Sequence, residues 1–512
     1  MRARTEPDEF MAVTATQHTG RTASEAAPGV EQLDVAAVNA PETRSLYAAR
    51  EKVYAKRAYG TYRTIKWIVM AVTLGIYYLL PWLRWDRGPY LADQAVLIDF
   101  PNRRFFFFFL EIWPQEFYFV TGLLILAALA LFLVTALAGR VWCGYTCPQT
   151  VWTDLMIAVE RFWQGDRNAR MRLDKAPWSF NKVWRKTATH VTWLAISVAT
   201  GGAFVFYFRD APTLMGEFLS FDAPAIAYIF VGIFAATTYL LGGIAREQVC
   251  IYMCPWPRIQ GAMFDHYSLL VSYRTWRGEP RGAHKKGESW DGRGDCIDCK
   301  QCVAVCPTGI DIRDGAQLEC IQCALCIDAC NSIMDRIGRP RGLIDYDTID
   351  NLEVASEGKT STLKLLRPRV LLYVGLILLV SLIMLVALLN RTVLEVNILR
   401  DRNPLFVELS DGSIRNGYTV KILNKLHKPG RFHVGIEGMK DATVKIVGFE
   451  KEKNPVISVL PDDLRALRVF VTVPRKNLET AKSGVTDFEF TVTDLNNDST
   501  VRNDTTFRSP GR

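Results

Sequence analysis

Eight of the twelve cysteines lie within one 35-residue stretch and repeat a single spacing. The first run reads C-x2-C-x2-C-x3-C-P from Cys296 to Pro307, and the second repeats the cysteine spacing from Cys320 to Cys330. In two-cluster ferredoxins, three thiolates of one run hold one cluster and the fourth cysteine ligates the other. Zinc sites and disulfides are the alternatives, but zinc sites use separate C-x2-C pairs. The spacing therefore predicts two [4Fe–4S] clusters, one on Cys296, Cys299, Cys302 and Cys330, the other on Cys306, Cys320, Cys323 and Cys326.

The remaining four cysteines form a second internal repeat. Residues 143–148 read CGYTCP and residues 250–255 read CIYMCP, so both fit C-x-Y-x-C-P. Proline favours the first position of a helix. This predicts that Cys147 and Cys254 are helix N-caps, where the positive end of the helix dipole favours a thiolate. If the two copies are neighbours, the chain has one further four-sulfur site, made of Cys143, Cys147, Cys250 and Cys254.

Several metals fit four such sulfurs. Soft thiolates favour Cu(I), and zinc or another iron centre also suits them. A lone cysteine in a membrane helix is usually a small inert residue, but two copies that each end in proline favour a metal or redox site. A site that prefers Cu(I) tenfold over Cu(II) raises the one-electron potential by about 59 mV. Such a site draws Cu(II) toward reduction, with the predicted clusters as electron donors.

Five apolar stretches approach the ~20 residues that a helix needs to cross a bilayer. They are residues 65–83, 117–138, 188–208, 224–244 and 370–389. In a chain of 512 residues with 49% hydrophobic composition, they predict an integral membrane protein. The two C-x-Y-x-C-P motifs follow the second and fourth stretches, so we expect them at the same face of the membrane.

The Lys and Arg content of the connecting segments predicts the orientation, since cytoplasmic loops are enriched in both. Residues 44–66 carry seven and residues 139–187 carry nine, whereas residues 84–116 carry four and residues 209–223 carry one. The N-terminus, both repeats and the clusters are therefore expected in the cytoplasm, which keeps thiols reduced. The net charge of +8 follows mostly from this asymmetry and does not indicate nucleic-acid binding.

The sequence pattern divides the chain into five parts. Residues 1–43 have no apolar period and are expected to be disordered in the cytoplasm. A four-span membrane domain covers residues 44–274, a ferredoxin-like cluster domain residues 275–369, and a fifth span residues 370–390. Residues 391–512 contain short alternating runs between turn signals, which predicts a β-sandwich on the outer side. We expect this sandwich to be a docking module.

The stretches CGYTCPQTVWTD (residues 143–154) and CIYMCPWPRIQGAMFD (residues 250–265) resemble the FixG/RdxA/CcoG family. The resemblance extends from about residue 45 to the C-terminus. It implies a five-span helical protein of the bacterial inner membrane, with a cytosolic bis-[4Fe–4S] insert and a periplasmic immunoglobulin-like C-terminal domain. It also implies a cupric reductase that supplies Cu(I) for assembly of cbb3-type cytochrome c oxidase. By position, the residues that handle the copper substrate would be Cys143, Cys147, Cys250 and Cys254.

Two other interpretations stay open at the level of sequence. The same spans resemble membrane subunits of quinol-dehydrogenase type, which favours a relay that passes electrons between quinol and a partner redox complex. In that case the four cysteines hold another iron centre. A third interpretation is an assembly scaffold with inactive redox centres.

The expected partners are the lipid bilayer, copper ions, and a copper chaperone, copper transporter or oxidase assembly factor. The sequence also leaves open a homodimer, in which the partner is a second copy of the chain. The electron donor, cytosolic or quinol, is not identified, since the chain has no dinucleotide-binding fingerprint after a strand.

Overall fold

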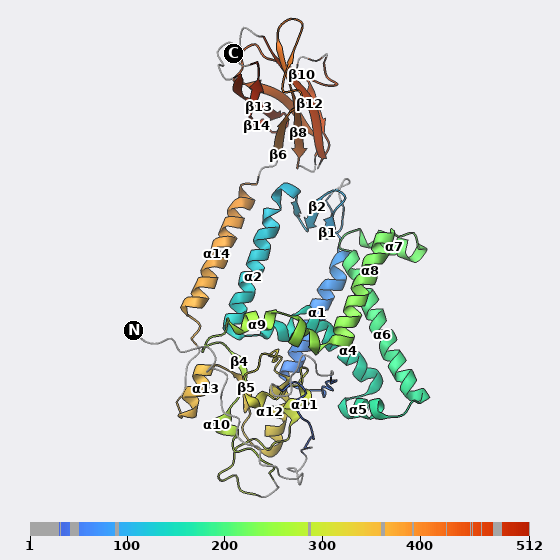
Figure 1. Cartoon of the computed structure of the whole chain (residues 1–512), viewed down its shortest axis with the longest axis vertical. Coiled ribbons are helices and arrows are strands. Elements are labelled where there is room, and N and C mark those ends of the chain that lie inside the picture. The colour runs from blue at the N-terminus through green and yellow to red at the C-terminus, as the bar shows by residue number, and fades with distance from the viewer. Residues whose placement is uncertain are drawn as a thin grey trace. The chain divides into compact units, whose positions relative to one another are not determined.

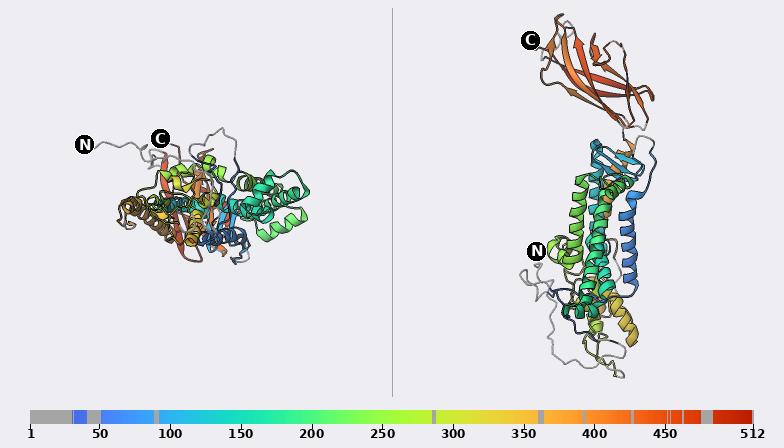
Figure 2. Two further views of the ribbon diagram at one scale, coloured as in Figure 1. Left: turned by 90° about the horizontal axis from the view of Figure 1, so that it is seen from below. Right: turned by 90° about the vertical axis from the view of Figure 1, so that its right-hand side faces the viewer.

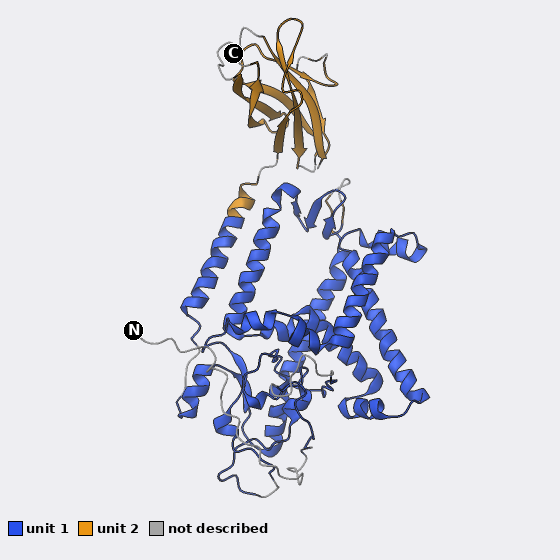
Figure 3. Cartoon of the chain, viewed as in Figure 1, with its two compact units in different colours: residues 1–84, 94–384 blue, residues 85–93, 385–512 orange. Residues whose placement is uncertain are grey.

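The computed structural model describes most of the chain: residues 30, 32–40, 51–87, 92–284, 288–359, 364–391, 394–425, 428–450, 452, 454–461, 463–474 and 484–510. The chain forms two compact units, residues 1–84 with 94–384 and residues 85–93 with 385–512 (Figure 3). The first unit contains the cysteine motifs and most of the apolar helices, and the second contains the C-terminal strands.

Five helices among the described residues are long and apolar enough to cross a membrane, as the sequence predicts. They are α1 (Thr61–Leu79) with the 3-10 turn η3 (Leu80–Trp82), η4 (Pro114–Glu116) with α2 (Tyr118–Ala138), α6 (Phe180–Val205), α8 (Ala225–Thr237) with the π-helix η5 (Thr238–Ala245), and α14 (Pro368–Leu389). Helix α6 begins before the predicted stretch at residue 188. Its first turns are polar, and Ser179 caps them by accepting a hydrogen bond from the backbone N–H of Lys182.

Short helices lie between the spans and the cluster domain, where α4 and α9 are seen across the middle of Figure 1. These are α3 (Val141–Tyr145), α4 (Pro148–Gln164), α5 (Arg167–Lys175), the π-helix η6 (Val249–Met253) and α9 (Trp256–Gly261). The opposite ends of the spans carry α7 (Ala211–Ser220) and a three-stranded sheet of β1 (Val96–Asp99), β2 (Arg104–Phe107) and β3 (Leu110–Ile112). The two cysteine repeats thus emerge at one end of the helices, which Figure 2 shows running side by side.

The cluster domain is closed by β4 (Leu270–Tyr273), which pairs with β5 (Ile344–Asp347) in an antiparallel ladder. Since β4 starts at Leu270, the domain already begins before the predicted boundary at residue 275. Between the two strands the chain forms α10 (Thr275–Gly278), α11 (Gln301–Val305), the 3-10 turn η7 (Ile312–Asp314) and α12 (Leu325–Ile337), and α13 (Ile349–Ser356) follows β5. Buried aliphatic residues, among them Ile297 and Ile333, pack around the cysteines.

The prediction of disorder for residues 1–43 is wrong for the described part, residues 30 and 32–40. Here the backbone N–H of Leu33 donates to the carbonyl of Cys299 at 3.3 Å, and Asn39 Nδ2 donates to the carbonyl of Thr308 at 2.6 Å. Leu33 is buried. The segment therefore packs on the cluster domain, an arrangement that its polar composition did not indicate. The other residues of 1–43 lie outside the described ones.

The second unit contains two antiparallel sheets. One has the order β10-β12-β8-β6, with β7 also paired to β8, and the other has the order β11-β9-β13-β14. Strands of both sheets contribute to one apolar core, for example Val420 from β8 and Phe490 from β13, both fully buried. This confirms the predicted β-rich C-terminal region. The strands are β6 (Leu394–Arg400), β7 (Val407–Glu408), β8 (Ile414–Asn424), β9 (Gly430–Glu437), β10 (Thr443–Ile446), β11 (Val456–Val459), β12 (Asp463–Val473), β13 (Val485–Asp494) and β14 (Ser499–Arg508).

Candidate redox site

The eight cysteines of the double run line two hollows in the cluster domain. One is lined by Cys296, Cys299, Cys302 and Cys330, and the other by Cys306, Cys320, Cys323 and Cys326. The fold therefore brings together the same two sets of four that the spacing predicts, although Cys302 also reaches the wall of the second hollow.

The backbone bends in the same way around both hollows. Asp298 and Lys300 flank Cys299 in left-handed conformations, with φ of 51° and 55°, and Gln322 and Ala324 flank Cys323 with φ of 54° and 58°. Non-glycine residues rarely adopt this conformation, and such residues cluster at functional sites. The bends turn backbone N–H groups toward sulfur: that of Gln322, for example, bonds Cys320. The repeated cysteine spacing was the only signal of this geometry in the sequence.

The hollows are chemically suited to a cationic group. Burial raises the pKa of the Cys302 and Cys326 thiols well above the ordinary value, and neighbouring cysteines raise that of Cys326 further. Burial and the neighbouring Cys306 raise the pKa of Cys320 to about 12. Four thiols packed in this way need positive charge in order to ionise, which the iron of a [4Fe–4S] cluster supplies.

The four remaining cysteines lie at the membrane-facing side of the cluster domain. Cys143 is on α3, and Cys147 is the N-cap of α4 with Pro148 at the first helical position, as predicted. Cys250 lies in η6, and Cys254 ends that helix. The predicted N-cap at Cys254 is displaced by one residue: Pro255 already has helical backbone angles and is itself the N-cap of α9.

Both repeats share one backbone feature that the sequence did not reveal. The N–H of Cys147 donates to the carbonyl of Trp142 at 2.9 Å, and the N–H of Cys254 donates to the carbonyl of Val249 at 2.8 Å. Each bond spans five residues, which is the π-helical pattern often found at functional sites. Cys147 and Cys254, the second cysteines of the two motifs, thus each close a backbone turn of the same kind.

The two repeats meet in space. The Cys143 thiol donates to Oε1 of Gln260, which follows the second motif, at 3.2 Å. Burial raises the pKa of Cys250 to about 12, and the nearby Cys147 and Cys143 thiols contribute to the rise. Cys143 is buried, whereas Cys254 is exposed. The fold therefore brings the four cysteines near one another and leaves Cys254 exposed. Within the described part of the chain, however, no three His, Cys, Asp or Glu side chains converge closely enough to hold one ion.

This four-cysteine group packs directly against the second hollow. Cys143 belongs to the same buried apolar cluster as Ile321 and Cys323. A Cβ atom added to Gly144 would lie 2.7 Å from the carbonyl oxygen of Ile321, so only glycine allows this approach. The Tyr145 hydroxyl donates to the carbonyl of Cys323 at 3.2 Å. Two sites predicted separately from the sequence are therefore neighbours.

Arg140 lies between the two sites, a role that the sequence did not reveal. Its side chain is buried, and Nη1 donates to the carbonyls of Leu318 and, at 3.0 Å, Cys320. Its backbone N–H donates to Oε1 of Gln322 at 2.7 Å. Burial raises the pKa of the Cys143 thiol, and the positive charge of Arg140 acts in the opposite direction. The same charge acts on Cys250 and Cys320, so one cation influences both sites.

Three family models match parts of the chain. A "4Fe-4S dicluster domain" matches residues 245–349, a "4Fe-4S binding domain" matches residues 120–164, and the "IG-like fold at C-terminal of FixG" matches residues 384–510. The first two matches also contain the C-x-Y-x-C-P motifs. The chain is thus an iron–sulfur redox protein with candidate membrane helices and an immunoglobulin-like C-terminal region.

Three curated relatives match over most of the chain. Nitrogen fixation protein FixG of Rhizobium meliloti is 52% identical over 486 residues, which is 89% of this chain and 93% of FixG. Protein RdxB of Cereibacter sphaeroides is 51% identical and covers 92% of this chain and 98% of its own length. Protein RdxA of the same organism is 49% identical, over 88% of this chain and 95% of RdxA.

Proposed function

Since the chain belongs to the FixG/RdxA family, we propose that it is a membrane-bound cupric reductase that delivers Cu(I) for assembly of a cbb3-type cytochrome c oxidase. Its substrate, Cu(II), takes up one electron at Cys143, Cys147, Cys250 and Cys254. The product leaves to a copper chaperone, a copper transporter or an assembly factor of the oxidase. The proposal places the clusters and the four-cysteine group in the cytoplasm and the C-terminal β-domain in the periplasm.

One observation supports this proposal above all others: a group of four thiols, of which Cys254 is exposed, packs through Cys143 against a buried hollow suited to an iron–sulfur cluster. Cysteines 296, 299, 302 and 330 would hold one [4Fe–4S] cluster and cysteines 306, 320, 323 and 326 the other. When bound, the clusters supply single electrons. Thiolates then favour Cu(I) over Cu(II) because they are soft ligands. The exposed Cys254 gives the ion a way in and out.

A second candidate rests on the family match to residues 120–164, which describes a 4Fe-4S binding domain that includes Cys143 and Cys147. In that function the four cysteines hold a further iron centre, and the protein relays electrons between quinol and a partner redox complex. Iron content separates the candidates. We expect about eight irons per chain for the reductase, and a clear excess over eight favours the relay.

The decisive experiment is anaerobic reduction of Cu(II) by the purified protein, with reduced methyl viologen as the donor and a Cu(I)-specific chelator as the readout. Replacing Cys143, Cys147, Cys250 and Cys254 by serine should abolish the part of the rate that exceeds the protein-free reaction and leave the iron content unchanged. The serine side chain is close in size to that of cysteine, but its hydroxyl is protonated and its oxygen is a hard ligand. The substituted site therefore loses its preference for Cu(I). Reduction by the quadruple variant at the wild-type rate would contradict the proposal.

A further inference from the structure

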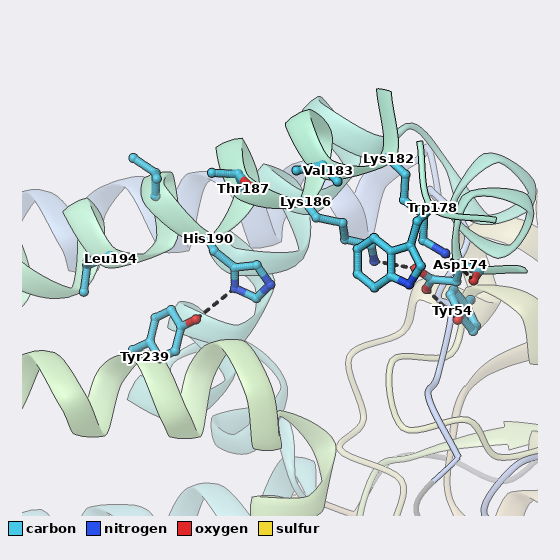
Figure 4. A pocket seen from close by; sticks show the side chains of 11 residues that line it. Tyr54, Asp174, Trp178, Lys182, Val183, Lys186, Thr187, His190, Leu194 and Tyr239 are labelled. Atoms are coloured by element: carbon cyan, nitrogen blue, oxygen red, sulfur yellow. Dashed lines mark hydrogen bonds and ion pairs between the residues drawn. The ribbon is translucent and has the colours of Figure 1, made fainter. Parts of the chain in front are cut away.

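A groove runs along the outside of α6 at the end of the spans that carries the cysteine repeats (Figure 4). It encloses about 790 Å³ between α5, α6 and η5. Trp178 and Lys182 lie at one end, and Val191 and Leu194 form an apolar wall at the other. The groove thus joins the polar segment before the span to the apolar body of α6.

A polar pair lies inside the apolar part of this groove. His190 on α6 and Tyr239 on η5 face each other, with His190 Nδ1 2.8 Å from the Tyr239 hydroxyl (Figure 4). His190 lies ten residues after Phe180, the first residue of α6, and two residues after residue 188, where the predicted apolar stretch begins, so it lies at the edge of the span. Among the described residues, no hydrogen bond is recorded for the second ring nitrogen, Nε2, which leaves it for a ligand.

The groove continues past His190 to a buried charged group. Its inner part is lined by Lys52, Glu160 and Arg246, which form ion pairs: Lys52 Nζ lies 2.7 Å and Arg246 Nη2 2.9 Å from Glu160 carboxylate oxygens. The carbonyl of Arg246 accepts from Gln149 Nε2 at 3.1 Å, and Gln149 follows Cys147 by two residues. The inner end of the groove therefore adjoins the backbone that carries the four-cysteine group.

The cations at the mouth of the groove are already engaged. Lys186 pairs with Asp174, which also accepts from the Tyr54 hydroxyl at 2.7 Å. Lys182 Nζ donates to the carbonyls of Asp174 and Ala176 at 2.9 and 2.6 Å. A phosphate headgroup would have to break these contacts, because it needs uncommitted positive charge. A neutral ring with hydroxyl groups needs only the His190–Tyr239 pair and the apolar wall.

We propose that this groove binds the headgroup of a quinol, with one quinol hydroxyl hydrogen-bonded to His190 Nε2. This inference rests on the proposed function and adds to it the reductant, which it assigns to the quinol. One quinol reduces two Cu(II) ions: its two O–H bonds break, two electrons leave, and the products are one quinone, two Cu(I) and two protons. His190 takes the first proton and passes it to water at the mouth of the groove, and the second follows the same route.

The test measures anaerobic Cu(II) reduction by the purified full-length protein with two donors, a short-chain ubiquinol and reduced methyl viologen. We expect His190→Phe to lower the quinol-driven rate at least tenfold and Tyr239→Phe several-fold. The viologen-driven rate should stay at the wild-type value, which also shows that the variants are folded. Val198→Phe is the matched control, because Val198 is exposed on α6 outside the groove. It should change neither rate.

A second readout does not depend on copper. A photoreactive azido-quinone should label peptides that contain residues 178–194 in the wild type, and His190→Phe should reduce this labelling. If the wild type reduces Cu(II) with viologen but not with quinol, and the groove is not labelled, the quinol site is wrong and the reductase stands. If labelling depends on His190 but neither donor drives Cu(II) reduction, the groove stands and the proposed function fails. If the wild type and His190→Phe are labelled equally, the groove takes up lipid-like molecules without using His190, and the inference is overturned.

Discussion

Two buried charged side chains join elements that are distant in sequence, Arg140 within the redox site and Asp154 between α4 and α1. Arg140 carries a positive charge between the four-cysteine group and the second hollow. Asp154 on α4 accepts two hydrogen bonds from Arg63 Nη1, at 2.9 and 2.8 Å, and lies 3.7 Å from Lys66 Nζ. No sequence motif predicts the contacts of Arg140 or of Asp154, because their partners are distant in sequence.

We expect Arg140→Gln to slow viologen-driven Cu(II) reduction about tenfold, equivalent to about 1.4 kcal/mol in the barrier. The variant loses the positive charge that favours negative charge at both sites, and the carbonyls of Leu318 and Cys320 lose the hydrogen bonds that Arg140 Nη1 donates to them. Arg140→Lys should recover part of the rate, because it keeps the charge but not the fork of donors. Iron content serves as the control for cluster loading. An Arg140→Gln variant with the wild-type rate and full iron would contradict this role.

Replacing Asp154 by Asn should destabilise the first unit by about 3–5 kcal/mol, because Arg63 and Lys66 stay buried without a counter-charge. Burial raises the pKa of the Asp154 carboxyl, but Lys66 and Arg63 lower it more, so the net direction is down. The ionised carboxylate therefore stabilises fully above the ordinary Asp pKa of about 3.9. This contribution is lost as the pH falls through the lowered value.

Thermal unfolding of wild type and Asp154→Asn at matched pH checks this sign. The difference in Tm should be constant near neutral pH and should shrink only in strong acid, since the variant lacks the titrating group. Effects of acid on the rest of the protein cancel in the difference. A difference that grows on acidification would be inconsistent with the lowered pKa.

At the scale of elements, the cluster domain caps the first membrane helix. Helix α1 has Gly60 as its N-cap, with φ of 152° and no side-chain cap of its own. Instead, Asp328 on α12 accepts from the backbone N–H groups of Tyr62 and Arg63 at 3.2 and 2.7 Å. Since α12 also carries Cys326 and Cys330, this contact fixes a cluster-bearing helix against a membrane helix.

We expect Asp328→Ala to cost about 1–2 kcal/mol, as for the loss of other N-caps. Hydrogen exchange at the amides of residues 61–64 should become faster, because two donors lose their acceptor. Asp335→Ala is the matched control: Asp335 lies on the same helix but pairs with the exposed Arg341 at the surface. Unchanged exchange at residues 61–64 in Asp328→Ala would show that the cap does not hold α1.

At the scale of the whole molecule, the proposed orientation has a direct test. The distribution of positive charge in the loops predicts that residues 391–512 lie outside the membrane and the clusters inside. The C-terminal β-domain contains no cysteine, so Glu450→Cys introduces a unique label there. A membrane-impermeant maleimide should label this position in intact spheroplasts without permeabilisation. Labelling only after the membrane is opened would reverse the orientation and remove the case for a periplasmic docking module.

The sequence by itself determined the features that depend on neighbouring residues. Cysteine spacing predicted the two sets of four, because a cluster takes three of its ligands from one short loop. Hydropathy predicted the five helices, because the bilayer fixes the length of each apolar stretch. Alternation predicted the strands of the C-terminal domain. Where composition was the only guide, at residues 32–40, the expectation of disorder was wrong, since Leu33 and Asn39 find partners on a distant domain.

Only the tertiary structure decided how these parts meet. The packing of Cys143 on Cys323, the position of Arg140 and the cap that Asp328 provides each join residues more than 170 positions apart. His190 and Tyr239 likewise come from different spans. Such contacts depend on which helix faces pack together. A periodic pattern predicts that a helix face is apolar, but it does not predict which other element packs on that face. The sequence thus identified the groups that carry the chemistry, and the fold placed them within reach of each other.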